Sequence, residues 1–155
     1  MDGSAKADPF FTARQVVFSA ILPYNVSNGK ERVTMEYRVL GKTGLKISRM
    51  GFGGIPIQRI DAEGTKALMH KLLENGVNYI DTARGYTVSE EYLGVGLEGI
   101  REHFVLATKS MSRTAEAMAK DIDISLKNLR TDYIDLYQIH NAPPADVEKV
   151  CSPGG

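Results

Sequence analysis

Four short apolar segments recur along this chain at intervals of roughly thirty residues, and a helical pattern separates each from the next. They are residues 50–54, 77–80, 104–108 and 133–139. This alternation is typical of βαβ units, in which successive strands run parallel and the crossovers are right-handed. The spacing therefore predicts a parallel sheet covered by helices. Doubly wound sheets and (β/α)8 barrels share it, so both folds stay open at this point.

The segments between these strands carry helix start and stop signals. Asp61 is placed as an N-cap, and Gly76 ends the pattern that follows it in the usual C′ position. Ser89 is expected to cap a second helix that runs to about Ile100, although its glycines lower the helix propensity. Thr114 opens a third helix with an apolar face. The chain is expected to open with a hairpin over residues 37–47 and to end in a loop over 143–155.

Composition favours an ordinary globular domain with a small-molecule site. Of 155 residues, 43% are hydrophobic and 25% are charged, and Lys+Arg and Asp+Glu both number 19. This balance argues against a nucleic-acid or anionic-membrane partner. A single cysteine, Cys151, allows no internal disulfide, and no Cys/His spacing predicts a metal site, so a reducing cytoplasm is expected. The apolar stretch at 16–22 is far too short to span a bilayer.

The chain divides into two parts of different character. Residues 1–34 show no sustained hydrophobic period, and we expect them to be a disordered extension. Residues 35–155 carry all of the strand and helix patterns described above. The first part is therefore predicted to lie outside the folded domain.

Ionisable residues fall at the ends of the predicted strands. Asp81, Lys109 and His140 each come directly after one of the last three strands, and Tyr86 lies in the loop that follows Asp81. In a (β/α)8 barrel these strand ends meet at one rim, where several strands together supply the catalytic groups. A plain salt bridge between Asp81 and Lys109 is the simpler alternative. No Gly-x-Gly-x-x-Gly stands between a strand and a helix, so a Rossmann cofactor site is not indicated.

Several strings of this sequence resemble the aldo-keto reductase family. Residues 37–45 (YRVLGKTGL) resemble its opening hairpin, and residues 51–54 (GFGG) its first barrel strand. Residues 78–86 (NYIDTARGY) look like its second-strand signature, 107–109 (ATK) its strand-three lysine, and 129–140 (LRTDYIDLYQIH) the unit ending in its histidine. The similarity runs from about 35 to about 150 and is greatest to bacterial members, some of which carry a C-terminal iron–sulfur domain. It implies the first half of a (β/α)8 barrel.

The resemblance also implies a reaction and roles for the residues at the rim. The family reduces aldehydes or ketones with hydride from NADP(H), or from NAD(H), while Tyr86 would donate the proton. A phenol ordinarily ionises near pH 10, and a neighbouring ammonium such as that of Lys109 stabilises the phenolate. Asp81 would orient Lys109. Gly54, Ile55 and Asp81 are expected to contact the cofactor, and His140 and Asn141 the carbonyl substrate.

A complete barrel of this type takes about 250 residues and eight strands, whereas four strands are predicted here. We therefore expect an incomplete barrel with little or no reductase activity, whose open strand edges could self-associate. Two other functions remain open. One is a barrel lyase with Lys109 as a Schiff-base former. The other is a non-catalytic fragment or binding subunit that retains the scaffold. A metal-dependent hydrolase is disfavoured, because no His-x-His follows the first strand.

Overall fold

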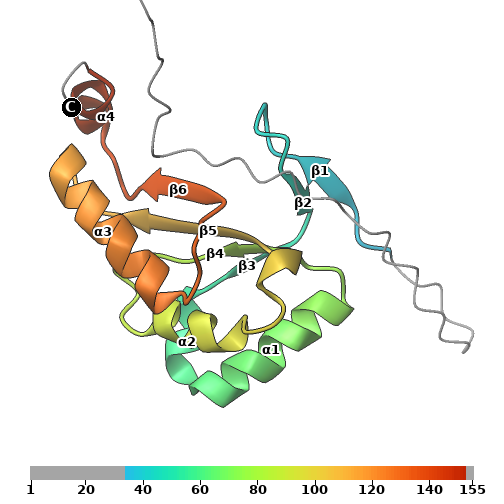
Figure 1. Cartoon of the computed structure of the whole chain (residues 1–155). Helices are drawn as coiled ribbons and strands as arrows, with labels where there is room; N and C mark the ends of the chain where they lie inside the picture. The colour runs from blue at the N-terminus through green and yellow to red at the C-terminus, as the bar shows by residue number, and fades with distance from the viewer. Residues whose placement is uncertain (1–33, 153–155) are drawn as a thin grey trace, which may run out of the picture. The chain divides into compact units, whose positions relative to one another are not determined.

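The computed structural model describes residues 34–152, in which a hairpin precedes a parallel sheet (Figure 1). The antiparallel hairpin consists of β1 (Tyr37–Val39) and β2 (Lys46–Ser48). The sheet consists of β3 (Gly51–Gly53), β4 (Tyr79–Asp81), β5 (Val105–Ser110) and β6 (Leu136–Ile139), in that order and all parallel. The predicted hairpin and parallel sheet are confirmed. The two outer strands are β3 and β6, as expected for an open part of a barrel.

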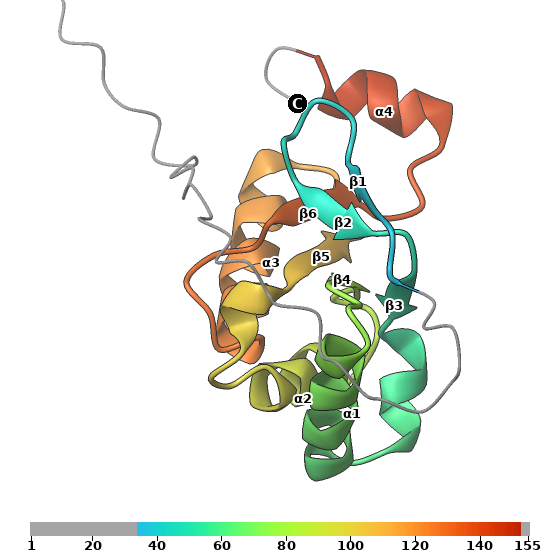
Figure 2. The ribbon, with the colours of Figure 1, turned by 90° about the vertical axis from the view of Figure 1, so that its right-hand side faces the viewer.

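Helices follow the strands along the chain. The α-helices are α1 (Ala62–Glu74), α2 (Ser89–Gly96), α3 (Ala115–Asn128) and α4 (Pro144–Val150), and two short 3₁₀ helices are η1 (Ile55–Arg59) and η2 (Arg101–His103). Of these, α1, α2 and α3 cover one face of the sheet, whereas α4 lies beyond the end of β6 (Figures 1 and 2). None of the helices between residues 34 and 152 combines the length and hydropathy needed to cross a bilayer. The hairpin lies at the end of the sheet opposite to α4 (Figure 1).

Three of the predicted helix signals are confirmed by hydrogen bonds and dihedral angles. The Asp61 carboxylate accepts a bond of 2.7 Å from the Gly64 amide and caps α1. Gly76 adopts a left-handed φ of 75° just beyond that helix. Thr114 accepts from the Ala117 amide at the start of α3.

The prediction that Ser89 caps α2 is wrong. The capping position belongs to Val88, and Ser89 is the first helical residue. Its hydroxyl is buried and donates instead to the Gly54 carbonyl, at 2.9 Å. The helix also ends at Gly96 rather than near Ile100, because Gly99 turns the chain with a φ of 77°. A partner thirty-five residues away thus takes the hydroxyl that a local cap would have used.

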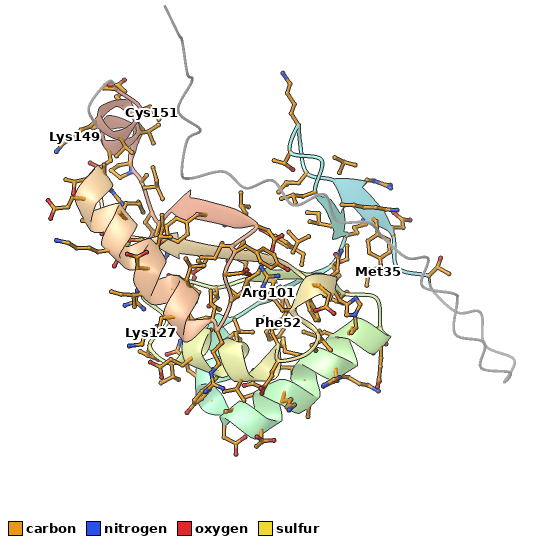
Figure 3. All side chains as sticks on the ribbon, viewed as in Figure 1. Met35, Phe52, Arg101, Lys127, Lys149 and Cys151 are labelled. Carbon is orange, nitrogen blue, oxygen red and sulfur yellow. The ribbon has the colours of Figure 1, made fainter. Side chains whose placement is uncertain are left out.

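The loop expected over residues 143–155 is wrong for Pro144–Val150, which forms α4; residues 153–155 lie outside the described part of the chain. Pro144 is the first residue of this helix, where proline loses no hydrogen bond and already has a helical φ. This helix has only seven residues and buries none of them fully. Cys151 follows it and is exposed; Figure 3 shows it beside Lys149 at this end of the molecule.

The strands begin one to three residues later than predicted, and two of the residues just before them make side-chain hydrogen bonds. Asn78 lies outside β4, and its side-chain oxygen accepts from the Ser48 amide at 2.6 Å, which joins the sheet to the hairpin. Asp135 lies outside β6 and accepts at 2.9 Å from the amide of Leu106 in the neighbouring strand. Asp81 and Lys109 therefore lie within their strands rather than after them, whereas His140 directly follows β6 as predicted.

The hydrophobic core fills the space between the sheet and the helices. Ile80 and Leu106 point from the central strands toward α1, α2 and the end of α3 and are fully buried. The core consists of Ile57, Met69, Ile80, Leu93, Leu97, Phe104, Leu106 and Leu129. Side chains alternate along a strand, so residues next to these apolar ones, such as Asp81, project from the opposite face. The core thus fixes which strand residues face the candidate site.

Two glycines allow α2 to approach its neighbours closely. A Cβ atom on Gly94 would overlap the Asn128 carbonyl oxygen at the end of α3. A Cβ atom on Gly96 would lie 3.0 Å from the Thr65 methyl group in α1. The glycines that weaken the helix propensity are therefore required by packing, and burial of the apolar face stabilises the helix instead.

Candidate active site

Asp81 and Lys109 form an ion pair across the two central strands. The Lys109 ammonium donates to the Asp81 carboxylate at 2.6 Å and to the Thr82 carbonyl at 2.8 Å. The Lys109 side chain is 12% exposed and that of Asp81 is 36% exposed, so the ammonium is largely removed from water. A buried ammonium needs such partners to offset its lost hydration. The predicted cross-strand salt bridge is therefore present, and the Lys109 ammonium can also interact with a neighbouring side chain.

Tyr86 lies above that ammonium. The Lys109 nitrogen is 4.9 Å from the centroid of the Tyr86 ring, a cation–π distance. The loop that carries the ring is held by its backbone: the Tyr86 amide donates to Ala83, and the Tyr86 carbonyl accepts from Ser89 at 2.8 Å. Thr87 takes a left-handed φ of 42°. The structure therefore brings the predicted tyrosine to the predicted lysine, in a loop with defined geometry.

His140 completes the group from the end of β6. Its ring meets the Tyr86 ring edge-on, with centroids 5.8 Å apart and planes at 86°. Its amide donates to the Ser110 carbonyl at 2.8 Å, which continues the ladder beyond the last residue of β6. The Nδ1 atom is buried and has no hydrogen-bond partner among residues 34–152. The four residues predicted to share one rim thus form a continuous row, in the order Asp81, Lys109, Tyr86 and His140.

Gln138 was missed from the sequence. Its side-chain amide donates to the second Asp81 carboxylate oxygen at 3.2 Å. Asp81 is therefore held from one side by Lys109 and from the other by Gln138. A signal was available, because side chains alternate along a strand and Gln138 must share a face with His140 two residues later. Polarity at this inward position could have marked it.

The three remaining predicted contact residues lie near this row in different environments. Gly54 is buried, donates its amide to the Asp81 carbonyl at 2.7 Å and accepts the Ser89 hydroxyl. A Cβ atom there would lie 2.9 Å from that hydroxyl, so packing within the chain requires glycine. Ile55 begins η1 with 54% of its surface exposed. Asn141 is exposed and has a left-handed φ of 48°.

A buried polar network lies behind the row, between the sheet and the helices. Glu90 in α2 is 1% exposed and accepts from the hydroxyls of Thr108 and Ser125, both at 2.8 Å. It also pairs with Arg84 at 3.1 Å. Arg84 belongs to the loop of Tyr86, and Thr108 is next to Lys109 in β5. Glu90 therefore connects the two segments that carry the ammonium and the phenol.

Asp121 in α3 extends this network toward the end of β5. Hydrogen bonds from the Ser110 and Ser112 hydroxyls, with Arg84 at 3.9 Å, hold the pKa of the Asp121 carboxyl below its usual value. Because Ser110 follows Lys109, this carboxylate is a second attachment of β5 to the helical layer. The row of polar groups on one face of the sheet is thus supported by ionised groups on the other.

Comparison with known proteins places these features in one family. The family model for the aldo/keto reductase family matches residues 49–152. L-galactose dehydrogenase of Arabidopsis thaliana is 32% identical over 133 residues, which cover 76% of this chain and 42% of that protein. The aldo-keto reductase YhdN of Bacillus subtilis is 34% identical over 129 residues, covering 71% of this chain and 39% of that protein.

The fold agrees with solved structures of the same family. The holo form of an aldo-keto reductase from Bacillus halodurans superimposes with a TM-score of 0.69 at 32% identity, covering 75% of this chain and 44% of that one. The chain spans about two fifths of the length of these relatives. Its parallel sheet and hairpin therefore correspond to part of a (β/α)8 barrel. Of the two folds that the strand spacing allowed, the doubly wound sheet is excluded and the barrel is confirmed. This chain belongs to the aldo-keto reductase family.

Proposed function

We propose that this chain carries the proton-transfer site of an NAD(P)H-dependent reductase that converts aldehydes or ketones to alcohols. The observation that supports this most strongly is the continuous row of Asp81, Lys109, Tyr86 and His140. The chain spans less than half the length of L-galactose dehydrogenase and of YhdN, so the proposal concerns the whole protein to which this segment contributes. NADP(H) is the preferred cofactor in the proposal and NAD(H) the alternative.

Within the row, the Asp81 carboxylate is suited to bind the nicotinamide end of such a cofactor. The Asp81 carboxylate keeps about a third of its surface exposed while its two oxygens are oriented by Lys109 and Gln138. It would accept a hydrogen bond from the nicotinamide ribose, and the exposed Ile55 side chain would pack nearby. Gly54 would not bind through its backbone, because its amide and carbonyl are both used within the chain. When bound, the reduced nicotinamide supplies the hydride.

Tyr86 would donate the proton to the carbonyl oxygen as that oxygen gains negative charge. Its phenolate would be stabilised by the Lys109 ammonium, which Asp81 and the Thr82 carbonyl hold beneath the ring. His140 would donate a hydrogen bond to the same oxygen, which fixes the carbonyl and stabilises the developing charge. The Nδ1 atom of His140 is buried, so the hydrogen bond to the substrate would come from the other ring nitrogen. Asn141 would contact the substrate from the adjacent loop.

The test is aldehyde-dependent oxidation of NADPH, followed by absorbance, in the complete protein to which this segment contributes (the parent) and in its Tyr86→Phe variant. We expect turnover to fall by at least about a hundredfold in Tyr86→Phe, because a general acid contributes on that order, while NADPH affinity is kept. Tyr133→Phe, which alters a tyrosine that stacks on Arg101, is the matched control. Unchanged reduction in Tyr86→Phe would refute the role of Tyr86. No aldehyde-dependent oxidation by the parent would refute the proposed reaction.

Two other functions are distinguished by simple measurements. In a lyase, the Lys109 amine would be covalently trapped on a carbonyl substrate by borohydride. The Lys109 Nζ atom already donates hydrogen bonds to Asp81 and Thr82, so it is not free to attack a carbonyl carbon. A non-catalytic binding subunit would show no affinity for either nicotinamide cofactor. NADPH binding by fluorescence therefore separates the reductase from the scaffold role.

A further inference from the structure

Arg113, in the loop after β5, uses every N–H of its guanidinium within the chain. Nε donates to the Asp146 carboxylate at 2.7 Å. One terminal nitrogen donates to the carbonyls of Met111 and Ser112 at 2.8 and 3.2 Å. The other donates to the carbonyls of His140 and Asn141 at 2.7 and 3.3 Å. A guanidinium has five N–H groups in a fixed planar fork, so these five acceptors saturate it.

We propose that Arg113 is a positioning residue that holds His140 against Tyr86. The chain leaves β6 at His140 and turns through the left-handed Asn141, a conformation unusual for a residue with a side chain. The carbonyls on both sides of that turn are bonded to one nitrogen of Arg113. Their orientation sets the direction of the peptide planes around His140 and hence the direction of its side chain.

The same guanidinium fixes the separation between the two sides of the row. Its other terminal nitrogen binds carbonyls just beyond Lys109, in the loop after β5. Tyr86 contacts Lys109 on one side and His140 on the other, so the spacing of the β5 and β6 ends decides whether both contacts exist. The sheet ladder ends with the bond from the His140 amide to Ser110. Arg113 continues that connection past the end of the ladder, and Asp146 of α4 orients it from the far side.

An arginine at the rim of such a site could instead bind an anionic substrate group. Its saturated donors argue against this, because a carboxylate or phosphate could gain a bond only by displacing one of the five acceptors. Its charge is also already balanced by Asp146. The side chain is 20% exposed, so it presents little surface to a ligand. Positioning of His140 is the role that these contacts support.

The experiment measures the reactivity of the His140 ring in the folded, full-length chain, with diethyl pyrocarbonate as the probe. Peptide mass spectrometry gives the modification rate of each histidine, and the exposed His70 and His103 serve as internal references. Arg113→Lys keeps the charge but cannot reach five acceptors in one plane. We expect its His140 rate, relative to the references, to rise about threefold or more, because several hydrogen bonds that order the turn are lost. Arg38→Lys, on the exposed hairpin, is the control and should leave the ratio unchanged.

A merely structural role for Arg113 would lower the free energy of unfolding without changing this ratio under conditions where the protein is folded. An unchanged ratio in Arg113→Lys would therefore overturn the proposal. If Arg113→Lys does not fold, Asp146→Asn replaces it, since it weakens only the bond that orients Nε. An increase in the His140 ratio is expected there too, and no increase would count against the proposal.

The positioning role of Arg113 rests on the proposed function only because that function gives His140 a substrate to bind. The positioning role and the proposed function can therefore fail separately. If the parent reduces an aldehyde, Arg113→Lys should raise KM for the aldehyde about tenfold, with little change in NADPH affinity. If the parent reduces none, the proposed function fails, whereas the His140 ratio still decides the role of Arg113.

Discussion

The buried carboxylate of Glu90 offers the sharpest test of how the row is supported, through replacement of Glu90 by glutamine. Four donors converge on this side chain: Thr108 and Ser125 at 2.8 Å, Arg84 at 3.1 Å and Asn128 at 3.4 Å. Glutamine has nearly the same shape but no charge. Its amide can face the two hydroxyls, which then accept from it, while its oxygen keeps Arg84. The variant therefore removes the charge and the acceptor of the two hydroxyls but keeps a hydrogen bond at each site.

The expected loss follows from the difference between charged and neutral hydrogen bonds. A bond to a charged group contributes about 1.5–3 kcal/mol and a neutral one about 1 kcal/mol. The Arg84 side chain is 26% exposed, so solvent screens part of that ion pair. With several weakened bonds, we expect Glu90→Gln to lower the free energy of unfolding by about 2 kcal/mol. Glu90→Leu, which leaves Arg84 and both hydroxyls without an acceptor, should lower it by about 3–5 kcal/mol.

Urea unfolding followed by far-UV circular dichroism at neutral pH measures these losses, with Glu91→Gln as the control. Glu91 is the next residue, lies in the same first turn of α2 and is exposed. Both variants therefore lose a similar favourable interaction with the helix dipole, about 0.3–1 kcal/mol, and the difference isolates the buried network. If Glu90→Gln is no less stable than Glu91→Gln, the carboxylate does not hold the network as an ion, and the reasoning is refuted.

Two further predictions concern the same helical layer. Because the pKa of Asp121 is lowered in the folded chain, its contribution to stability is present above the unfolded value of about 4 and is lost as the pH falls through the folded value. As the pH is lowered, the free energy of unfolding should therefore fall more steeply in the parent than in Asp121→Asn. Equal slopes would contradict this assignment. Gly94→Ala should cost about 1–3 kcal/mol in urea unfolding despite the better helix propensity of alanine, because its Cβ would overlap the Asn128 carbonyl. Gly85→Ala, with open space around the new methyl group and an ordinary φ, is the control, and equal stability of the two variants would show that α2 can shift freely.

Much of the fold could be predicted because its signals are local. Asp61 and Thr114 cap helices through amides only three residues away, and Gly76 ends α1 through its own dihedral angle. The regular alternation of strand and helix predicted the parallel sheet. Since parallel strands end at one edge, the alternation also predicted that Asp81, Lys109 and His140 would lie together.

What escaped prediction depends on bonds between residues that are distant in the chain. Asp81 and Gln138 are 57 residues apart, Glu90 and Ser125 are 35 apart, and Arg113 and Asp146 are 33 apart. Ser89 was taken for a cap because its distant partner, the Gly54 carbonyl, leaves no local trace. The helix α4 has only seven residues, which is too short for an apolar period to be recognised in its sequence.

The sequence by itself thus determined the family, the order of the strands and the membership of the row. Only the tertiary structure decided how the row is held: by Gln138 beside Asp81, by Glu90 behind β5, and by Arg113 across the rim. The physical reason is that a polar side chain has several possible partners of similar strength. Sheet pairing and helix packing select one of these partners by bringing it within hydrogen-bond distance in the buried interior, where water does not compete.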